Sequence, residues 1–166
     1  VLWALDRASY GQCDGSNGDF MHYEGDADIP DPWNGENNHH CYFDVLQILD
    51  VSGMSSFELG LHAEIDSAAS DESWGFNRLS ITFNDGTAAG TGTVVESSDL
   101  SWSNTQTYDA GGSEGIVNGF WGGEVNTVTT TVPVPDGATS ALLRLRYWAI
   151  DSWDGGETAS VTMDGS

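Results

Sequence analysis

Carboxylates gather in four short stretches of the chain, each rich in glycine, serine, alanine or asparagine. The stretches read CDGSNGD, EGDADIPD, IDSAASDE and DSWDGGE. Calcium takes about six to eight oxygen ligands at roughly 2.3–2.6 Å, and carboxylates two or three residues apart on a flexible loop suit it. The predicted ligands are Asp14, Asp19, Asp26, Asp28, Asp31, Asp66, Asp71, Asp151, Asp154 and Glu157, with Glu24 and Glu72 in the same stretches. None of the stretches is an EF-hand, and a solvated acidic surface is the alternative for any single one.

The overall charge favours bound cations as well. The chain has 26 acidic residues against four basic ones, all of them Arg, and a formal net charge of -22. A folded domain this acidic repels itself, and either bound cations or high external salt would offset the repulsion. No basic patch is present to neutralise phosphates, so nucleic acid is excluded as the expected partner. We expect several Ca²⁺ ions as the cofactor.

Aromatic residues in polar loops are the second chemical signal. Trp33 lies in PDPWNGE and Trp121 in NGFWGGE, and Tyr23 has a similar setting. Exposed aromatic rings form flat platforms for sugar rings or peptide side chains. The predicted ligand-binding residues are Trp33, Trp121, Tyr23, Gly122 and Gly123. The alternative is that Trp33 and Trp121 plug a sheet edge or cap the core, as we expect for Trp74, Trp148 and Trp153.

Recognisable catalytic motifs are missing from the sequence. It contains no nucleophile elbow, no phosphate-binding loop and no HExxH zinc motif. Carboxylate pairs would suit a glycosidase, and the four His residues would suit bases or metal ligands. Adjacent residues such as His39 and His40 rarely point at one ion, so polar loop positions are the simpler reading. We expect that the protein is not an enzyme.

Short β-type runs separated by turn residues predict the elements that hold these loops. The runs are CYFDVLQILDV, SSFELGLHAEI, FNRLSITF, GTVVES, VNTVTTTVPV, ALLRLRYWAI and ASVTM. In ALLRLRYWAI, apolar Leu143, Leu145 and Tyr147 alternate with Arg144 and Arg146, which is typical of a half-buried antiparallel strand. Seven or more such strands without helical periodicity predict an all-β fold, an antiparallel two-sheet β-sandwich.

Two segments of the chain resemble each other. SGMSSFELGLHAEIDS is similar to DGATSALLRLRYWAIDS, with Leu59 matching Leu143 and Leu61 matching Leu145. Each copy is followed by an acidic stretch that contains a tryptophan. The similarity fits either an internal duplication or one hairpin geometry used twice. In both cases an acidic loop is expected after a long apolar strand.

The first third of the chain has no strand periodicity from Tyr10 to His40. Cys13 and Cys41 stand at the two ends of this stretch, and no CxxC spacing indicates zinc or redox chemistry. A Cys13–Cys41 disulfide would close a loop of roughly 30 residues and contribute on the order of 3 kcal/mol in the chain-entropy model. We expect a long loop stapled at its base. Two free thiols are the alternative.

The organisation of the chain is expected to be simple. Its 166 residues suit one domain, 1–166, with a substantial core. No run of 18 apolar residues is present, so no membrane-spanning helix is expected. We expect a domain cut from a larger secreted protein, extracellular and at the cell surface.

A family resemblance rests on the stretch RYWAIDSWDGGETASVTMDG, residues 146–165. This stretch is similar to a jelly-roll module in which Ile-Asp-Ser-Trp-Asp-Gly-Glu ends one strand and Asp-Gly closes the next; here Gly156 is one residue extra. The chain resembles the Ca²⁺-dependent peptide-binding domain of large bacterial RTX adhesins. The resemblance implies a jelly-roll-like sandwich, several calcium ions and a calcium-assisted site for the C-terminal end of a target-cell protein.

Three kinds of binding behaviour follow as alternatives. The resemblance favours an adhesion module whose partner is a peptide or glycoprotein on another cell's surface. A calcium-dependent lectin is the alternative, and a structural spacer in a long adhesin is the third. The ligand is expected at one end of the sandwich, near Asp26, Asp28, Trp33 and Trp121. Truncating either tryptophan should then weaken binding with little change in melting temperature.

Overall fold

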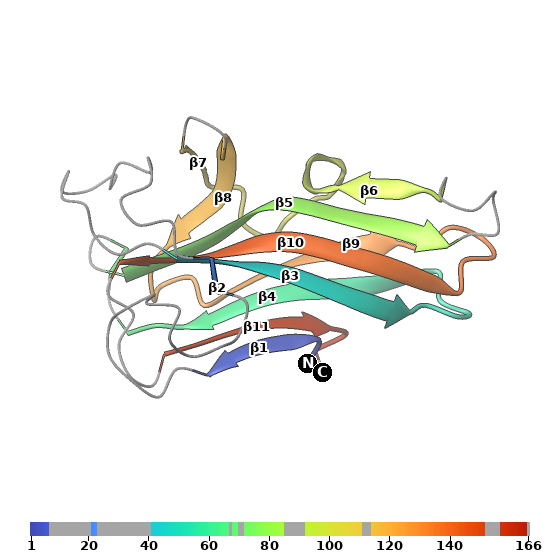
Figure 1. Cartoon of the computed structure of the whole chain (residues 1–166), viewed down its shortest axis with the longest axis horizontal. Helices are drawn as coiled ribbons and strands as arrows, with labels where there is room; N and C mark the ends of the chain where they lie inside the picture. Colours follow the sequence, from blue (N-terminus) through green and yellow to red (C-terminus); the bar gives the residue numbers. More distant parts are fainter. Residues whose placement is uncertain are drawn as a thin grey trace.

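The computed structural model of the chain describes residues 1–6, 21–22, 41–66, 68–69, 72–84, 92–110, 114–151 and 157–165. These residues form two antiparallel sheets that stack as two layers (Figure 1). The predicted all-β, two-sheet sandwich is therefore confirmed. The described part of the chain contains no helix long and apolar enough to cross a membrane.

The first sheet has four strands in the order β1-β11-β4-β9. Its members are β1 (Trp3–Asp6), β11 (Thr158–Met163), β4 (Ser56–Glu64) and β9 (Thr127–Pro133). All three pairings are antiparallel. In β9, buried Val128, Thr130 and Val132 alternate with more exposed neighbours, as expected for a strand with one face in the core.

The second sheet is larger and follows the order β2-β3-β10-β5-β8-β7, with β6 paired to β5 as well. Its members are β2 (Met21–His22), β3 (Cys41–Asp50), β10 (Ser140–Asp151), β5 (Glu72–Asn84), β8 (Ile116–Trp121), β7 (Thr107–Asp109) and β6 (Val94–Glu96). A single turn of 3-10 helix, η1 (Ser97–Asp99), follows β6. In Figure 1, β6, β7 and β8 lie on the side of β5 opposite to β10.

The core fills the space between the layers, as the alternating runs predicted. Leu143, Leu145 and Tyr147 on β10 are at most 3% exposed, and Leu59 and Leu61 on β4 are fully buried. Burying one such side chain completely contributes roughly 1.5–3 kcal/mol. The two similar segments thus supply facing strands: β4 belongs to the first sheet and β10 to the second.

A β-bulge interrupts the alternation in β5. Phe76 and Leu79 are both buried although they are three residues apart, so one residue between them must be accommodated outside the regular pleat. Arg78 has the left-handed φ of 53°, and the pairing of β5 with β10 shifts register between Arg144 and Arg146. A bulge of this kind re-aims a side chain. Here it turns Arg78 to the solvent, and the core pattern resumes at Leu79.

Strand β8 corrects one expectation from the sequence. The stretch NGFWGGE was interpreted as a loop, but its first half is strand, ending at Trp121. Gly119 has a φ of 133°, and a Cβ there would lie 2.7 Å from the Trp74 carbonyl oxygen and 2.8 Å from Gly75 Cα. Glycine is therefore required by close approach of two backbones rather than by a turn.

The N-terminal third is described only in part. Met21 and His22 form β2 and pair with Phe43 and Tyr42, so the expectation of no strand between Tyr10 and His40 is wrong for these two residues. Cys41 begins β3, and Cys13 lies outside the described residues. The Cys13–Cys41 bridge and the stapled loop stay predictions.

Candidate metal centre

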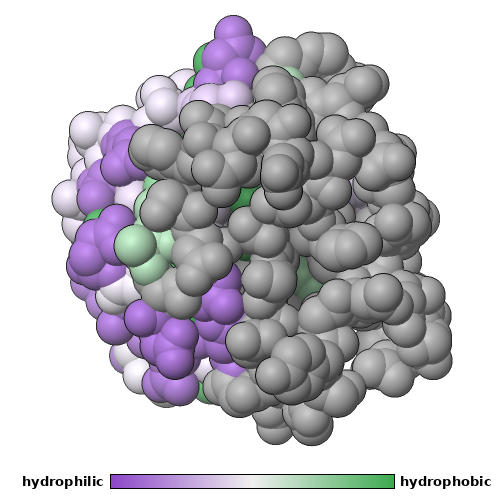
Figure 2. All heavy atoms as spheres, turned by 90° about the vertical axis from the view of Figure 1, so that its left-hand side faces the viewer, coloured by the Kyte–Doolittle hydropathy of each residue, from purple (hydrophilic) through white to green (hydrophobic). Residues whose placement is uncertain are grey.

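Three carboxylates from two distant parts of the chain meet at one end of the sandwich. One ligand oxygen each from Asp66, Glu72 and Glu157 lies within 4.8 Å of the other two. Asp66 follows the end of β4, Glu72 is the first residue of β5, and Glu157 comes directly before β11. These strand ends lie together at the left of Figure 1. The same end faces the viewer in Figure 2, where the surface of the described residues is mostly hydrophilic.

The register of the sheets explains why the three meet. Asp151, the last residue of β10, pairs with Glu72 on β5, so the DSWDGGE stretch leaves the second sheet beside Glu72. The chain re-enters the first sheet as β11, where Thr158 pairs with Glu64, two residues before Asp66. Both acidic stretches that follow the similar strands β4 and β10 are thereby brought to one point.

Burial distinguishes this cluster from a solvated acidic surface. Glu72 is 4% exposed and Glu157 is 6% exposed, whereas Asp66 is exposed. Glu72 Oε2 is buried and accepts no hydrogen bond from the described residues. A buried carboxylate oxygen without a donor is unfavourable, and neighbouring like charges add repulsion. A cation bound among the three would relieve both effects.

The donor set and spacing fit calcium. All three ligands are carboxylates, which suit hard cations such as Ca²⁺, Mg²⁺ or Mn²⁺, whereas zinc sites usually include His or Cys. Two oxygens on one Ca²⁺ are at most about 5 Å apart, because each Ca–O distance is roughly 2.3–2.6 Å. The 4.8 Å limit on the three atoms lies inside that range. Carboxylates can bind Ca²⁺ with one or both oxygens, so three of them supply much of its coordination.

We call residues 66–72, which connect β4 to β5 and include Asp66 and Glu72, the metal loop. A hydrogen bond within this loop and close packing from the segment after β8 hold its backbone. The amide of Glu72 donates to the carbonyl oxygen of Ala68 (3.1 Å), which closes the turn that leads into β5. A Cβ on Gly122 would lie 2.3 Å from Ala69 N, so Gly122 is in close contact with this turn. Val125 N donates to Gly122 O (3.0 Å), and Trp74 Nε1 donates to Val125 O (2.8 Å). The segment after β8 therefore supports the metal loop from the core.

The predicted ligand-binding residues of the GFWGGE stretch have different positions from those expected. Trp121 is 1% exposed and contacts Trp74, with ring centroids 4.8 Å apart, so the expectation of an exposed platform is wrong. The reason is that Trp121 ends a strand whose inner face belongs to the core. Gly122 is buried against the metal loop and Gly123 is half-buried beside it. The core positions expected for Trp74 and Trp148 are confirmed.

The remaining predicted residues divide by whether the structure describes them. Asp66 and Glu157 come together with Glu72, which the sequence placed in the same acidic stretch as Asp66. Asp151 lies at the end of β10, in register with Glu72. The other predicted residues lie outside the described part: Asp14, Asp19, Asp26, Asp28, Asp31, Asp71, Asp154, Tyr23 and Trp33, together with Trp153.

Similarity to known proteins adds no further identification. No protein-family model matches the chain, and neither a curated protein nor a solved structure matches it significantly. The resemblance to the RTX adhesin domain therefore rests on the RYWAIDSWDGGETASVTMDG stretch and, more loosely, on the size of the chain, its acidity, its lack of Lys and its loop-rich first third. Glu157 belongs to that stretch and to the carboxylate cluster.

Proposed function

We propose that the chain is a calcium-dependent adhesion module that binds the C-terminal end of a peptide on a target-cell protein. The observation that carries the proposal is the meeting of Asp66, Glu72 and Glu157 at one end of the sandwich. The acidic composition and the RTX-like stretch support it. The module would be a non-enzymatic, extracellular domain of a jelly-roll-like adhesin, at the cell surface.

Calcium would have two tasks in this module. Bound among the three carboxylates, it would hold β4, β5 and β11 together at the end where their loops emerge. An ion with an open coordination position could also accept a carboxylate oxygen from the ligand. A carboxylate approaching a domain of net charge -22 would otherwise be repelled. Binding of a peptide C-terminus is therefore expected to need the ion.

The test is a binding measurement with peptides that carry either a free or an amidated C-terminus. The free-acid peptides should bind in calcium, and amidation should weaken binding at least roughly 30-fold, since removing one partner of a close charge pair costs about 2 kcal/mol or more. Chelator should abolish binding at a concentration where a melting curve still shows a folded domain.

Other outcomes would replace the proposal. Equal binding of free and amidated peptides, or equal binding in chelator, contradicts calcium-assisted capture of a C-terminus. Calcium-dependent binding on a glycan array without peptide binding identifies the lectin alternative. Absence of binding both to the peptides and to the glycan array identifies a structural spacer.

The Cys13–Cys41 bridge belongs to the same proposal. It would fix the base of the N-terminal loop against β3, which begins at Cys41. Thiol titration of the denatured, unreduced protein should find no reactive thiol. Two reactive thiols would refute the bridge.

A further inference from the structure

A second candidate site lies along β5, well away from the carboxylate cluster. A cleft of about 510 Å³ opens between β5, η1 with the end of β6, and β8. Small-molecule sites commonly have volumes of roughly 300–1,000 Å³. Arg78 and Ser80 in its wall are six and eight residues beyond Glu72, which corresponds to roughly 20–26 Å along a strand. The cleft is thus separate from the candidate metal centre.

The wall of the cleft presents both hydrogen-bond donors and acceptors. It carries hydroxyl, amide, guanidinium and carboxylate groups from Arg78, Ser80, Glu96, Ser97, Ser98 and Asn118. Ile116 adds an apolar surface, and 57% of this residue is exposed. This mixture suits a ligand that offers hydroxyl groups on its edges and C–H groups on its faces.

Arg78 is the best-defined polar group of the cleft. Its left-handed φ of 53° places it in the β5 bulge, and 45% of its side chain is exposed. A non-glycine residue in that conformation is strained by on the order of 1 kcal/mol or more, and such strain gathers at functional sites. Its guanidinium donates to Glu114 Oε1 (2.9 Å), which orients the side chain beside the cleft.

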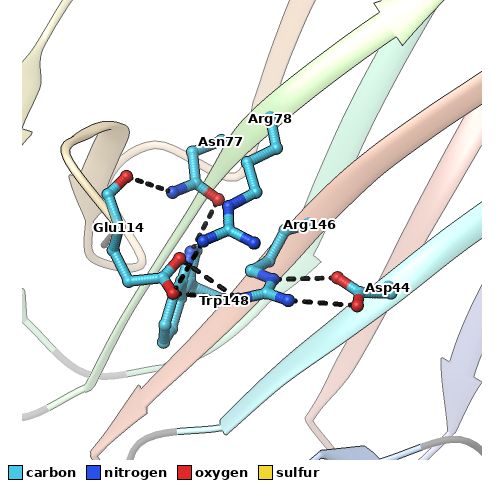
Figure 3. Close-up of polar contacts among 6 residues, drawn as sticks. All are labelled: Asp44, Asn77, Arg78, Glu114, Arg146 and Trp148. Atoms are coloured by element: carbon cyan, nitrogen blue, oxygen red, sulfur yellow. Dashed lines mark hydrogen bonds and ion pairs between the residues drawn. The ribbon is translucent and has the colours of Figure 1, made fainter. Parts of the chain in front are cut away.

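A polar network, buried at Asn77, Arg146 and Trp148 but exposed at Asp44, holds Glu114 in turn (Figure 3). Arg146 Nη1 donates to both Glu114 carboxylate oxygens (3.0 and 3.2 Å), and Asn77 Nδ2 donates to the Glu114 carbonyl (3.0 Å). Asn77 Oδ1 accepts from Trp148 Nε1 (3.1 Å), and Arg146 donates to both carboxylate oxygens of Asp44 (2.8 and 3.1 Å). Each group that positions Arg78 is itself fixed by another.

Arg146 remains positively charged in this setting. Burial alone would lower its pKa, but its hydrogen bonds to Asp44 and the charges of Asp44 and Glu114 outweigh burial and raise the pKa. The guanidinium carbon also lies 3.4 Å from the centroid of the Tyr42 ring. Buried ion networks are weak evidence for stability, because desolvation offsets most of their attraction. What the contacts do provide is orientation: Arg146 holds the Glu114 carboxylate, and that carboxylate holds Arg78.

Ser97 supplies a second oriented group. Its Oγ accepts hydrogen bonds from Trp102 Nε1 (3.2 Å) and Asn118 Nδ2 (3.3 Å). A serine hydroxyl has two acceptor positions and one donor hydrogen, so these two bonds leave the hydrogen to point elsewhere. Because Ser97 lines the cleft, a ligand hydroxyl there would find a fixed donor.

The charge balance disfavours an anionic ligand, and the Arg78 guanidinium in the wall disfavours a cationic one. Arg78 is offset by Glu114, Glu96 adds a negative charge, and the whole chain carries -22. An anionic ligand would be repelled by that field, whereas a neutral ligand avoids the repulsion. We propose that the cleft beside Arg78 binds a neutral sugar through its ring hydroxyls, with the sugar's C–H face against Ile116. This activity goes beyond the proposed function and needs no calcium.

The experiment uses the full chain and a panel of neutral mono- and disaccharides, with binding followed by calorimetry or by chemical shifts. At least one sugar should bind, and R78Q should weaken binding roughly tenfold or more, because a hydrogen bond to a charged group is worth about 1.5–3 kcal/mol. S98W should block binding by filling the cleft. Chelator should leave the affinity unchanged at any concentration where the domain stays folded.

R144Q is the matched control. Arg144 is also an exposed arginine of the second sheet but does not line the cleft, so its replacement should leave sugar affinity unchanged. The proposal is overturned if no sugar of the panel binds at about 10 mM, ten times a Kd of 1 mM. It is equally overturned if R78Q and S98W bind as the parent does, or if R144Q is as weak as R78Q. Preference for an acidic sugar over its neutral counterpart would refute the ligand class.

Discussion

Replacing Trp121 with alanine is expected to lower the stability of the domain by about 3–5 kcal/mol, the usual range for a large aromatic removed from a core. Trp121 is 1% exposed and contacts Trp74 and Phe76, with ring centroids 4.8 and 6.2 Å apart. At roughly 2–4 °C per kcal/mol for a domain of this size, the melting temperature should fall by roughly 6–20 °C. Thermal unfolding in calcium measures the change.

Two further variants make the result specific. Ile116 lies on the same strand but is 57% exposed, so I116A should change stability by less than about 0.5 kcal/mol. Trp121 Nε1 is buried and has no hydrogen-bond partner among the described residues, so W121F keeps most of the packing and removes a polar group with no described partner. We expect W121F to lose far less than W121A. A W121A protein that melts with the parent would contradict the buried position.

The sequence predicted most of the sandwich because its strands carry a strong period-two signal. In β10, Leu143, Leu145 and Tyr147 face the core as the alternation indicated. Arg146 departs from that pattern: the prediction placed it with Arg144 on the polar face, but it is only 7% exposed. Glu114, from the segment before β8, and the Tyr42 ring of β3 cover Arg146. Contacts between segments so distant in sequence cannot be inferred from local alternation.

The glycine-rich strand β8 shows where local reasoning fails. Glycine and asparagine before a tryptophan are typical of loops, so Trp121 was listed as an exposed ligand-binding residue, with a core position as the alternative. In the structure Gly119 allows two backbones to approach, a requirement that depends on Trp74 and Gly75 far earlier in the chain. The break in alternation at Arg78 was visible in FNRLSITF. Its cause, a bulge with φ of 53°, appears only with the strands paired.

The candidate metal centre was predicted in its chemistry and only partly in its membership. Residue type and spacing placed Asp66 and Glu157 in two acidic stretches, and each stretch was interpreted as a separate calcium site. The register of β10 against β5, and of β11 against β4, joins the two clusters into one. Glu72 was noted as a carboxylate of the same acidic stretch as Asp66, but its burial at the start of β5 is a tertiary property that the sequence did not predict.

Calcium is expected to stabilise the domain, and Glu72 should control part of that effect. A ligand that binds only the native state adds about 2.7 kcal/mol at 100 times Kd for one site. For a chain of this size, that corresponds to roughly 5–11 °C in melting temperature. Ions held elsewhere would add to it. An unchanged melt in excess chelator would instead indicate an acidic surface offset by ordinary salt.

The variant E72Q should change stability in opposite directions with and without calcium. In chelator, glutamine removes a buried charge from a group of three carboxylates, so E72Q should melt above the parent. In saturating calcium, E72Q should melt below the parent, because it has lost a ligand and with it up to the one-site contribution of about 2.7 kcal/mol. E58Q, at an exposed position of β4, is the matched control and should follow the parent in both conditions. Relief of repulsion alone would raise the melting temperature of E72Q equally with and without calcium, and that result would exclude an ion at this cluster.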